Sequence, residues 1–149
     1  TLAMNILDTN SMTYQAIWEY NQGKQINSED IQSAIDKKQQ CLNQIDLIFR
    51  NFDFLALPSA QVYPFDKNLQ FPKNINGIEL DTYHRWLEVF ILSSLLDLPT
   101  VTIPVGFNKN GMPMGMQIIG RNKDDLNVFS FAYKYEDIFN YSKIKPELN

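Results

Sequence analysis

The clearest pattern of hydrophobic and polar positions lies in the last third of the chain. Apolar residues alternate with others from Val101 to Phe107 and again from Met114 to Ile118, and the link Asn108-Lys109-Asn110-Gly111 separates the two runs. A period of two is typical of a β-strand, and a short link containing Gly favours a hairpin. We therefore expect a β-hairpin in which Gly111 supplies the positive φ of the turn.

Helices are predicted around this hairpin, where apolar residues recur at helical spacing between Gly and Pro breaks. The expected helices cover residues 12–21, 28–49 and 82–96, and a last one runs from 122 or 124 to about 141. Asn10 or Ser11 is the expected N-cap of the first helix, with Gly23 just past its end. The last segment is apolar on more than one side, which predicts that it is heavily covered.

One further strand is predicted before a long segment without a pattern. The run Phe54-Leu55-Ala56-Leu57 stops at Pro58, which indicates a buried strand with neighbours on both sides. Residues 59–80 show no clear period, which is uncommon in a compact domain unless the segment is functional or belongs to a larger body. We expect one domain over residues 1–149 with helices packed on a mixed β-sheet, of the α/β class or, as the alternative, the α+β class.

Composition narrows the class of protein. Of the 149 residues 44% are hydrophobic and 20% charged, close to globular averages, which excludes intrinsic disorder. Thirteen Lys and Arg stand against seventeen Asp and Glu, with no basic stripe for phosphates, so we expect no direct nucleic-acid partner. The most apolar stretch, Trp86 to Leu96, is well short of the ~20 residues of a membrane span, so no membrane partner is expected.

The metal-binding and redox residues are few. One cysteine, Cys41, and one histidine, His84, cannot form a disulfide or complete a zinc shell. The pair Asp124-Asp125 is interpreted as a helix start, where acids are favourable, and not as a metal site. We therefore expect no metal and a reducing, cytoplasmic setting. Residue 1 is Thr, from which we expect a piece of a longer protein.

Four blocks of sequence and one later residue resemble the C-terminal third of the amidase signature enzymes. They are Phe52-Asp53-Phe54-Leu55-Ala56-Leu57-Pro58-Ser59, Tyr83-His84-Arg85-Trp86, Leu98-Pro99-Thr100-Val101-Thr102-Ile103-Pro104-Val105-Gly106-Phe107, Gly111-Met112-Pro113-Met114-Gly115-Met116-Gln117-Ile118-Ile119-Gly120, and Glu136. The second block is most similar to bacterial general amidases of that family. One position departs from the family, because Asp97 stands where a small residue, usually Gly, precedes Leu-Pro. The resemblance implies a C-terminal fragment of a larger amidase.

The resemblance also implies where the chemistry lies. Enzymes of this family hydrolyse carboxamides, or transfer ammonia released from glutamine, with a serine nucleophile, a second serine with a cis peptide bond, and a lysine. These residues lie around a Gly-Gly-Ser-Ser stretch in the N-terminal part, and this sequence has no such stretch. Its only serine pair, Ser93-Ser94, lies between leucines, without Gly to bring a backbone N–H near an oxyanion. We therefore expect no catalytic residue, no cofactor and no activity in this chain alone.

Tyr83 and Trp86 are the residues that the resemblance implies for substrate binding, because the corresponding segment borders the substrate pocket in the family. Three positions apart, they share one side of a helix, and such aromatics suit a pocket for an acyl or amine group; ordinary core residues are the alternative. Ser59 is interpreted as a turn or capping residue, and His84 as a structural or interface residue. Gln117, within an apolar strand, is expected to make a structural hydrogen bond if it is buried.

Three functions remain open. The chain is part of an amide hydrolase that takes a small-molecule amide, the corresponding part of the A component of a glutamine amidotransferase that works with charged tRNA, or a non-catalytic interaction module. The Tyr-His-Arg-Trp block favours the first. A Gly-Gly-Ser-Ser stretch in the reading frame upstream of Thr1 would exclude the third. Because a chain of this kind has uncovered sheet edges and apolar surface, we also expect a homo-oligomer.

Overall fold

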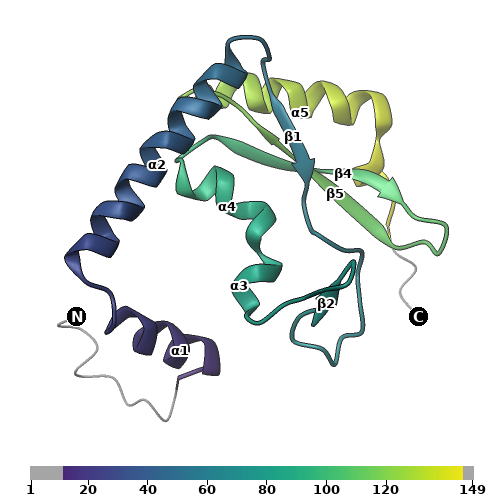
Figure 1. Ribbon diagram of the computed structural model, residues 1–149. Helices are drawn as coiled ribbons and strands as arrows, with labels where there is room; N and C mark the ends of the chain where they lie inside the picture. Colours follow the sequence, from purple (N-terminus) through teal and green to yellow (C-terminus); the bar gives the residue numbers. More distant parts are fainter. Residues whose placement is uncertain (1–11, 146–149) are drawn as a thin grey trace. The chain divides into compact units, whose positions relative to one another are not determined.

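The structure is a computed structural model that describes residues 12–145, and the chain divides into two compact units, one up to Gln39 and one from Gln40 onward. The expectation of a single domain stays a prediction. The first unit holds helix α1 (Tyr14–Gly23) and the start of helix α2 (Ser28–Phe49). The second unit holds the β-sheet and the remaining helices (Figure 1).

Capping side chains set the starts of both helices. The Thr13 hydroxyl accepts a hydrogen bond from the Ala16 N–H at 3.4 Å, so α1 begins at Tyr14 and not at Met12. The expected caps, Asn10 and Ser11, lie outside the described residues, and the Gly expected just past the helix end is its last residue. The predicted start of α2 is confirmed, because the Asn27 side chain accepts from the N–H groups of residues 29 and 30 at 2.8 and 3.0 Å.

The central sheet of the second unit has three strands in the order β1-β5-β4, all paired antiparallel (Figure 1). They are β1 (Leu55–Pro58), β4 (Thr100–Phe107) and β5 (Pro113–Ile119). The predicted hairpin of β4 and β5 is confirmed, and Gly111 has the expected positive φ of 76°. The turn is held by the Asn108 side chain, whose oxygen accepts from the N–H groups of Asn110 and Met112.

Strand β1 differs from its prediction. Its only strand partner among residues 12–145 is β5, so it lies at the sheet edge and not between two strands. Burial also alternates along it, with Leu55 and Leu57 half-buried and Ala56 and Pro58 exposed. The apolar run was interpreted as covered on both faces, whereas one face of this strand packs into the core and the other is open.

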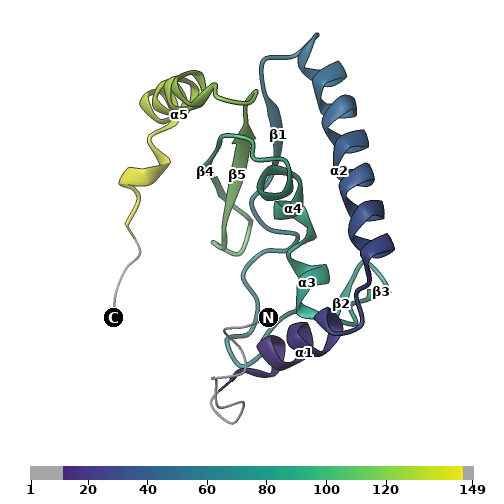
Figure 2. The same cartoon turned by 90° about the vertical axis from the view of Figure 1, so that its left-hand side faces the viewer.

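Helices lie on both faces of the sheet (Figure 2). Helix α5 (Asp125–Phe139) packs on one face, and helix α4 (Glu88–Leu95) with residues 40–49 of α2 lies on the other. The core on the α2 side is built from Ile45, Phe49 and Leu96, against which Leu55 packs from the sheet. This arrangement confirms the α/β fold of helices on a sheet. The sheet was predicted to be mixed, whereas all strand pairs within residues 12–145 are antiparallel.

The predicted heavy covering of the last helix is wrong for the described part of the chain. Only Val128 of α5 is fully buried, at 2% exposure, whereas Leu126, Phe129 and Tyr133 are 79%, 65% and 76% exposed. The helix therefore turns one apolar side to the sheet and a second apolar side outward, and no described element covers the second. A short 3₁₀ helix, Tyr141–Lys143, follows it.

The helix expected over residues 82–96 is two helices, α3 (Tyr83–Trp86) and α4, joined at Leu87 with φ −88° and ψ 0°. The Gln61 side chain explains the break. Its Nε2 donates to the carbonyls of Arg85 and Trp86 at 2.7 and 2.6 Å, and these carbonyls would otherwise accept from the next helical turn.

The segment without a sequence pattern, residues 59–80, contains a small hairpin. Strands β2 (Asn74–Ile75) and β3 (Ile78–Glu79) pair antiparallel around Asn76 and Gly77, whose φ angles are 50° and 83°. An Asn-Gly pair with positive φ at both positions is the preferred two-residue hairpin turn, so the signal was present in the sequence.

Candidate functional site

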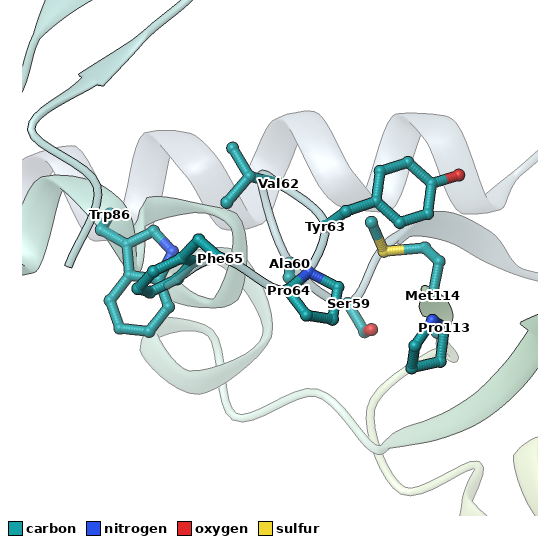
Figure 3. A pocket seen from close by; sticks show the side chains of 10 residues that line it. Ser59, Ala60, Val62, Tyr63, Pro64, Phe65, Trp86, Pro113 and Met114 are labelled. Carbon is teal, nitrogen blue, oxygen red and sulfur yellow. The ribbon is translucent and has the colours of Figure 1, made fainter. Parts of the chain in front are cut away.

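A pocket of about 190 Å³ lies where the loop after β1 meets the end of α3 and the start of β5 (Figure 3). It is lined by Ser59, Ala60, Val62, Tyr63, Pro64, Phe65, Trp86, Pro113, Met114 and Gly115. Figure 3 shows Trp86 and Phe65 at one end and Pro113 and Met114 at the other, with Pro64 and Ser59 between them. We call this cavity the Trp86 pocket.

Only one of the two predicted substrate-binding residues, Trp86, lines the pocket. Trp86 lines the pocket and meets the Phe65 ring edge-on, with centroids 5.5 Å apart at 83°. Tyr83 does not line the pocket; its ring lies 5.5 Å from that of Trp86 and 6.1 Å from that of the buried Phe71, both measured between centroids. Tyr83 therefore supports the indole of Trp86, and a role for either residue in binding stays a prediction.

Two glutamine side chains hold the walls of the Trp86 pocket together. Gln61, from the loop, donates to the carbonyls of Arg85 and Trp86 and so fixes the loop to the end of α3. Gln117, from β5, is 1% exposed, and its Nε2 donates to the carbonyls of Pro58 and Val89, both at 2.9 Å. The expected structural hydrogen bond of Gln117 is confirmed, and it joins β5 to the residue before the loop and to the first turn of α4.

Ser59 closes the pocket on the β5 side. Its N–H donates to the Gly115 carbonyl at 2.9 Å, which extends the pairing of β1 and β5 by one residue. A Cβ on residue 115 would collide with the Ser59 hydroxyl, which would have to move, so Gly115 favours this close approach. The backbone of Ser59 thus continues the strand pairing by one residue, and a turn or capping role for its side chain stays a prediction.

The other candidate residues lie in structural positions. Ser93 lies inside α4, where its hydroxyl donates to the Phe90 carbonyl at 3.3 Å. Asp124 occupies the N-cap position of α5 and Asp125 its first turn, as predicted. His84 lies in α3, next to the exposed Arg85, which pairs with Glu88 at 3.3 Å.

Metal-ligating side chains are scattered over residues 12–145. No three His, Cys, Asp or Glu side chains in that range gather to hold a metal ion. None of the helices within it combines the length and the hydropathy needed to cross a membrane.

A second, polar cavity of about 220 Å³ lies at the other end of the sheet and is lined by Asp53, Phe54, Arg121, Asp124 and Asn127. Arg121 has a structural role in this cavity. Its guanidinium donates to the Phe49 carbonyl at 2.7 Å, at the end of α2, and lies 3.6 Å from the Asp53 carboxylate. Positive charge on the last carbonyls of a helix is favourable, so this cavity is best explained as a helix-capping cluster.

Sequence reasoning missed the loop that forms half of the Trp86 pocket. Tyr63-Pro64-Phe65 lies in the segment without a period, and Gln61 bonds to residues 24 and 25 positions away. The available signal was the length of the segment without a pattern, which is uncommon unless the segment is functional.

The chain matches the family model described as Amidase over residues 8–129. Among curated relatives, the A component of glutamyl-tRNA(Gln) amidotransferase from Brevibacillus brevis is 43% identical over 108 residues, which is 71% of this chain and 20% of that protein. The protein of the same name from Thermodesulfovibrio yellowstonii is 31% identical over 108 residues, 71% of this chain and 21% of that protein. This chain therefore spans about a fifth of the length of these relatives.

Solved structures show the same fold. A bacterial aryl acylamidase of the amidase signature enzymes superposes with a TM-score of 0.78 and 22% identity, covering 95% of this chain and 30% of that one. 6-Aminohexanoate cyclic dimer hydrolase gives 0.72 and 17%, covering 95% and 31%. The A component of the Thermotoga maritima glutamyl-tRNA(Gln) amidotransferase gives 0.62 and 20%, covering 87% and 28%. With the family model matching most of its length, this chain belongs to the amidase signature family.

Proposed function

We propose that this chain is the C-terminal portion of an enzyme that hydrolyses carboxamide C–N bonds, in which it supplies sheet, packing and one wall of the substrate pocket. One observation carries the proposal. Three of the sequence blocks that resemble the family meet at the Trp86 pocket, because Ser59, Trp86 and Pro113–Gly115 come from the first, second and fourth blocks. Distant stretches that share one cavity favour a common binding role.

The proposal assigns binding to this chain and bond cleavage to residues outside it. The resemblance implies that the nucleophile, the second serine and the lysine lie in the N-terminal part of such enzymes. We expect the purified chain to leave a panel of aliphatic and aromatic amides intact above the buffer rate. Turnover that survives repurification and is lost on substitution of Ser59 or His84 would contradict this assignment.

The test of the binding role is Trp86→Ala in the complete enzyme. We expect the ranking of amide substrates by kcat/KM to change, by about 1 to 3 kcal/mol in transition-state binding, which is typical for an altered pocket contact. Tyr83→Ala should act in the same direction but more weakly, because Tyr83 contacts Trp86 without lining the pocket. A uniform loss of activity, with the ~3 to 5 kcal/mol loss of stability typical of a truncated core aromatic, would make Trp86 a core residue instead.

A second function has support of its own, since the curated relatives named above are A components of glutamyl-tRNA(Gln) amidotransferase. Under this alternative the complete protein would release ammonia from glutamine for a tRNA-bound acceptor. Hydrolysis rates of glutamine and of a neutral amide, measured on the complete protein with the same preparation, separate the two. A strong preference for glutamine would favour the amidotransferase.

A further inference from the structure

The side chains around the Trp86 pocket share one chemical property. Within the described part of the chain, none of the ten residues that line the pocket carries a charge. A free α-amino acid presents an ammonium and a carboxylate, and burying either without a charged or strongly hydrogen-bonding partner is costly. The lining therefore favours an uncharged ligand group.

The size of the pocket limits what that group is. A volume of about 190 Å³ is below the ~300 Å³ at which pockets begin to hold a whole drug-sized ligand. It exceeds the roughly 150 Å³ of an engineered apolar cavity, in another protein, that binds benzene. The pocket, which is open to solvent, thus has room for one ring of a larger substrate.

The shape of the walls favours a flat ring. The indole of Trp86 and the ring of Phe65 meet nearly at right angles, and Pro64 and Pro113 add two further ring surfaces (Figure 3). Aromatic rings prefer edge-to-face and offset contacts of this kind. Gln61 fixes the loop to α3, and Gln117 fixes β5 to the residue before the loop and to α4. These walls therefore exist before the ligand arrives, which lowers the ordering cost of binding.

From the uncharged lining, the one-ring volume and the preformed aromatic corner, we propose that the Trp86 pocket binds an uncharged aromatic ring of the substrate and rejects charged groups. The inference rests on the proposed function only in identifying the ring as part of an amide. It names a substrate class, aryl-substituted amides, and it predicts poor binding of glutamine.

The experiment is a binding titration on this chain, read by the fluorescence of Trp86. The chain has two tryptophans, so Trp18→Phe leaves Trp86 as the reporter. We expect acetanilide to give a saturable change in the millimolar range, the affinity that so small a ligand allows. 4-Acetamidobenzenesulfonate, which adds a charge to the same ring, and glutamine should each bind at least about tenfold more weakly.

Two lysine variants at the start of β5, one inside the pocket lining and one outside it, test whether the ring enters this pocket. Met114→Lys places an ammonium in the lining and should abolish the response, whereas Met112→Lys, two residues away, exposed and outside the lining, should leave it unchanged. If Met114→Lys fails to melt cooperatively, Met114→Gln replaces it, and a weaker response is expected. Equal binding by the two lysine variants, no saturable response to acetanilide, or glutamine binding as tightly as acetanilide would overturn the proposal.

The result is separable from the proposed function. Ring binding by this chain together with no hydrolysis of any amide by the complete protein would overturn the proposed function and leave the pocket assignment standing. Amide hydrolysis by the complete protein with no preference for aryl substrates, and no ring binding by this chain, would do the reverse.

Discussion

At the scale of single residues, the backbone at Asp97 explains why the family, as the resemblance implies, usually has Gly at this position. It follows α4 with φ 53°, in the left-handed region, and the next N–H, of Leu98, donates to the Ser93 carbonyl at 3.1 Å. This is the hydrogen bond of a Schellman motif, whose left-handed position usually holds Gly because a Cβ is unfavourable there. The Gly that usually occupies this position in the family therefore has a conformational cause.

The prediction at Asp97 compares two substitutions that both remove the carboxylate. We expect Asp97→Gly to be more stable than Asp97→Ala by about 1 kcal/mol, because Gly adopts the left-handed conformation without a steric penalty. Chemical denaturation of both variants gives the difference directly. Equal midpoints would mean that the end of α4 does not depend on the backbone at this position.

Residues with a local signal could be predicted from the sequence, and residues that act at long range could not. The positive φ of Gly111 and the helix-start position of Asp124-Asp125 depend on immediate neighbours, and both were predicted. Gln117 was expected to need a partner, but its acceptors, Pro58 and Val89, lie 59 and 28 positions away. Nothing in the residue type distinguishes Gln61, which breaks a helix, from a solvated loop amide.

At the scale of elements, the Gln117 side chain links β5 to β1 and to α4. Its removal tests whether these hydrogen bonds stabilise the arrangement of elements around the Trp86 pocket. Gln117→Leu keeps the volume but leaves the carbonyls of Pro58 and Val89 without this donor. We expect a loss of about 1 to 3 kcal/mol in the free energy of unfolding, the cost of unsatisfied buried polar groups.

The control for this substitution is Gln32→Leu. Gln32 donates to Asp36 on the exposed surface of α2, where a change of about 0.5 kcal/mol or less is expected. Indistinguishable melting curves for the two variants would show that the bonds of Gln117 do not hold β1, β5 and α4 together.

Elements with a regular period were predicted, and their partners were not. Alternation located the β4–β5 hairpin, and acids with a following apolar period located α2. The break between α3 and α4 was missed because a side chain from another segment causes it. Within the described residues α5 is less covered than predicted and β1 has a strand neighbour on one side only, because an apolar sequence reports which surface is suited to burial, and not which part of the protein covers it.

At the scale of the whole molecule, the family could be predicted because each of its blocks is contiguous in sequence. The match to the family's sequence model confirms this prediction. The Trp86 pocket depends on the meeting of three of those blocks with a loop that has no pattern. The exposed apolar side of α5 could not be predicted for a similar reason. The helix's own residues determine which of its sides is apolar, but they do not determine whether another element covers that side.

We predict that the isolated chain self-associates through the outward side of α5. Leu126, Phe129 and Tyr133 follow one another at spacings of three and four, so they form one stripe, and all three are more than 60% exposed. A net charge of −4 opposes the contact of two such stripes only weakly.

Sedimentation over a dilution series should show a dimer that dissociates on dilution, and Phe129→Lys should favour the monomer. Leu69→Lys, at an exposed leucine far from α5 in sequence, should change nothing, whereas Ala56→Lys tests the alternative of pairing at the β1 edge. A 17.3 kDa monomer at tens of micromolar, with a cooperative melt, would show that the stripe alone does not drive association.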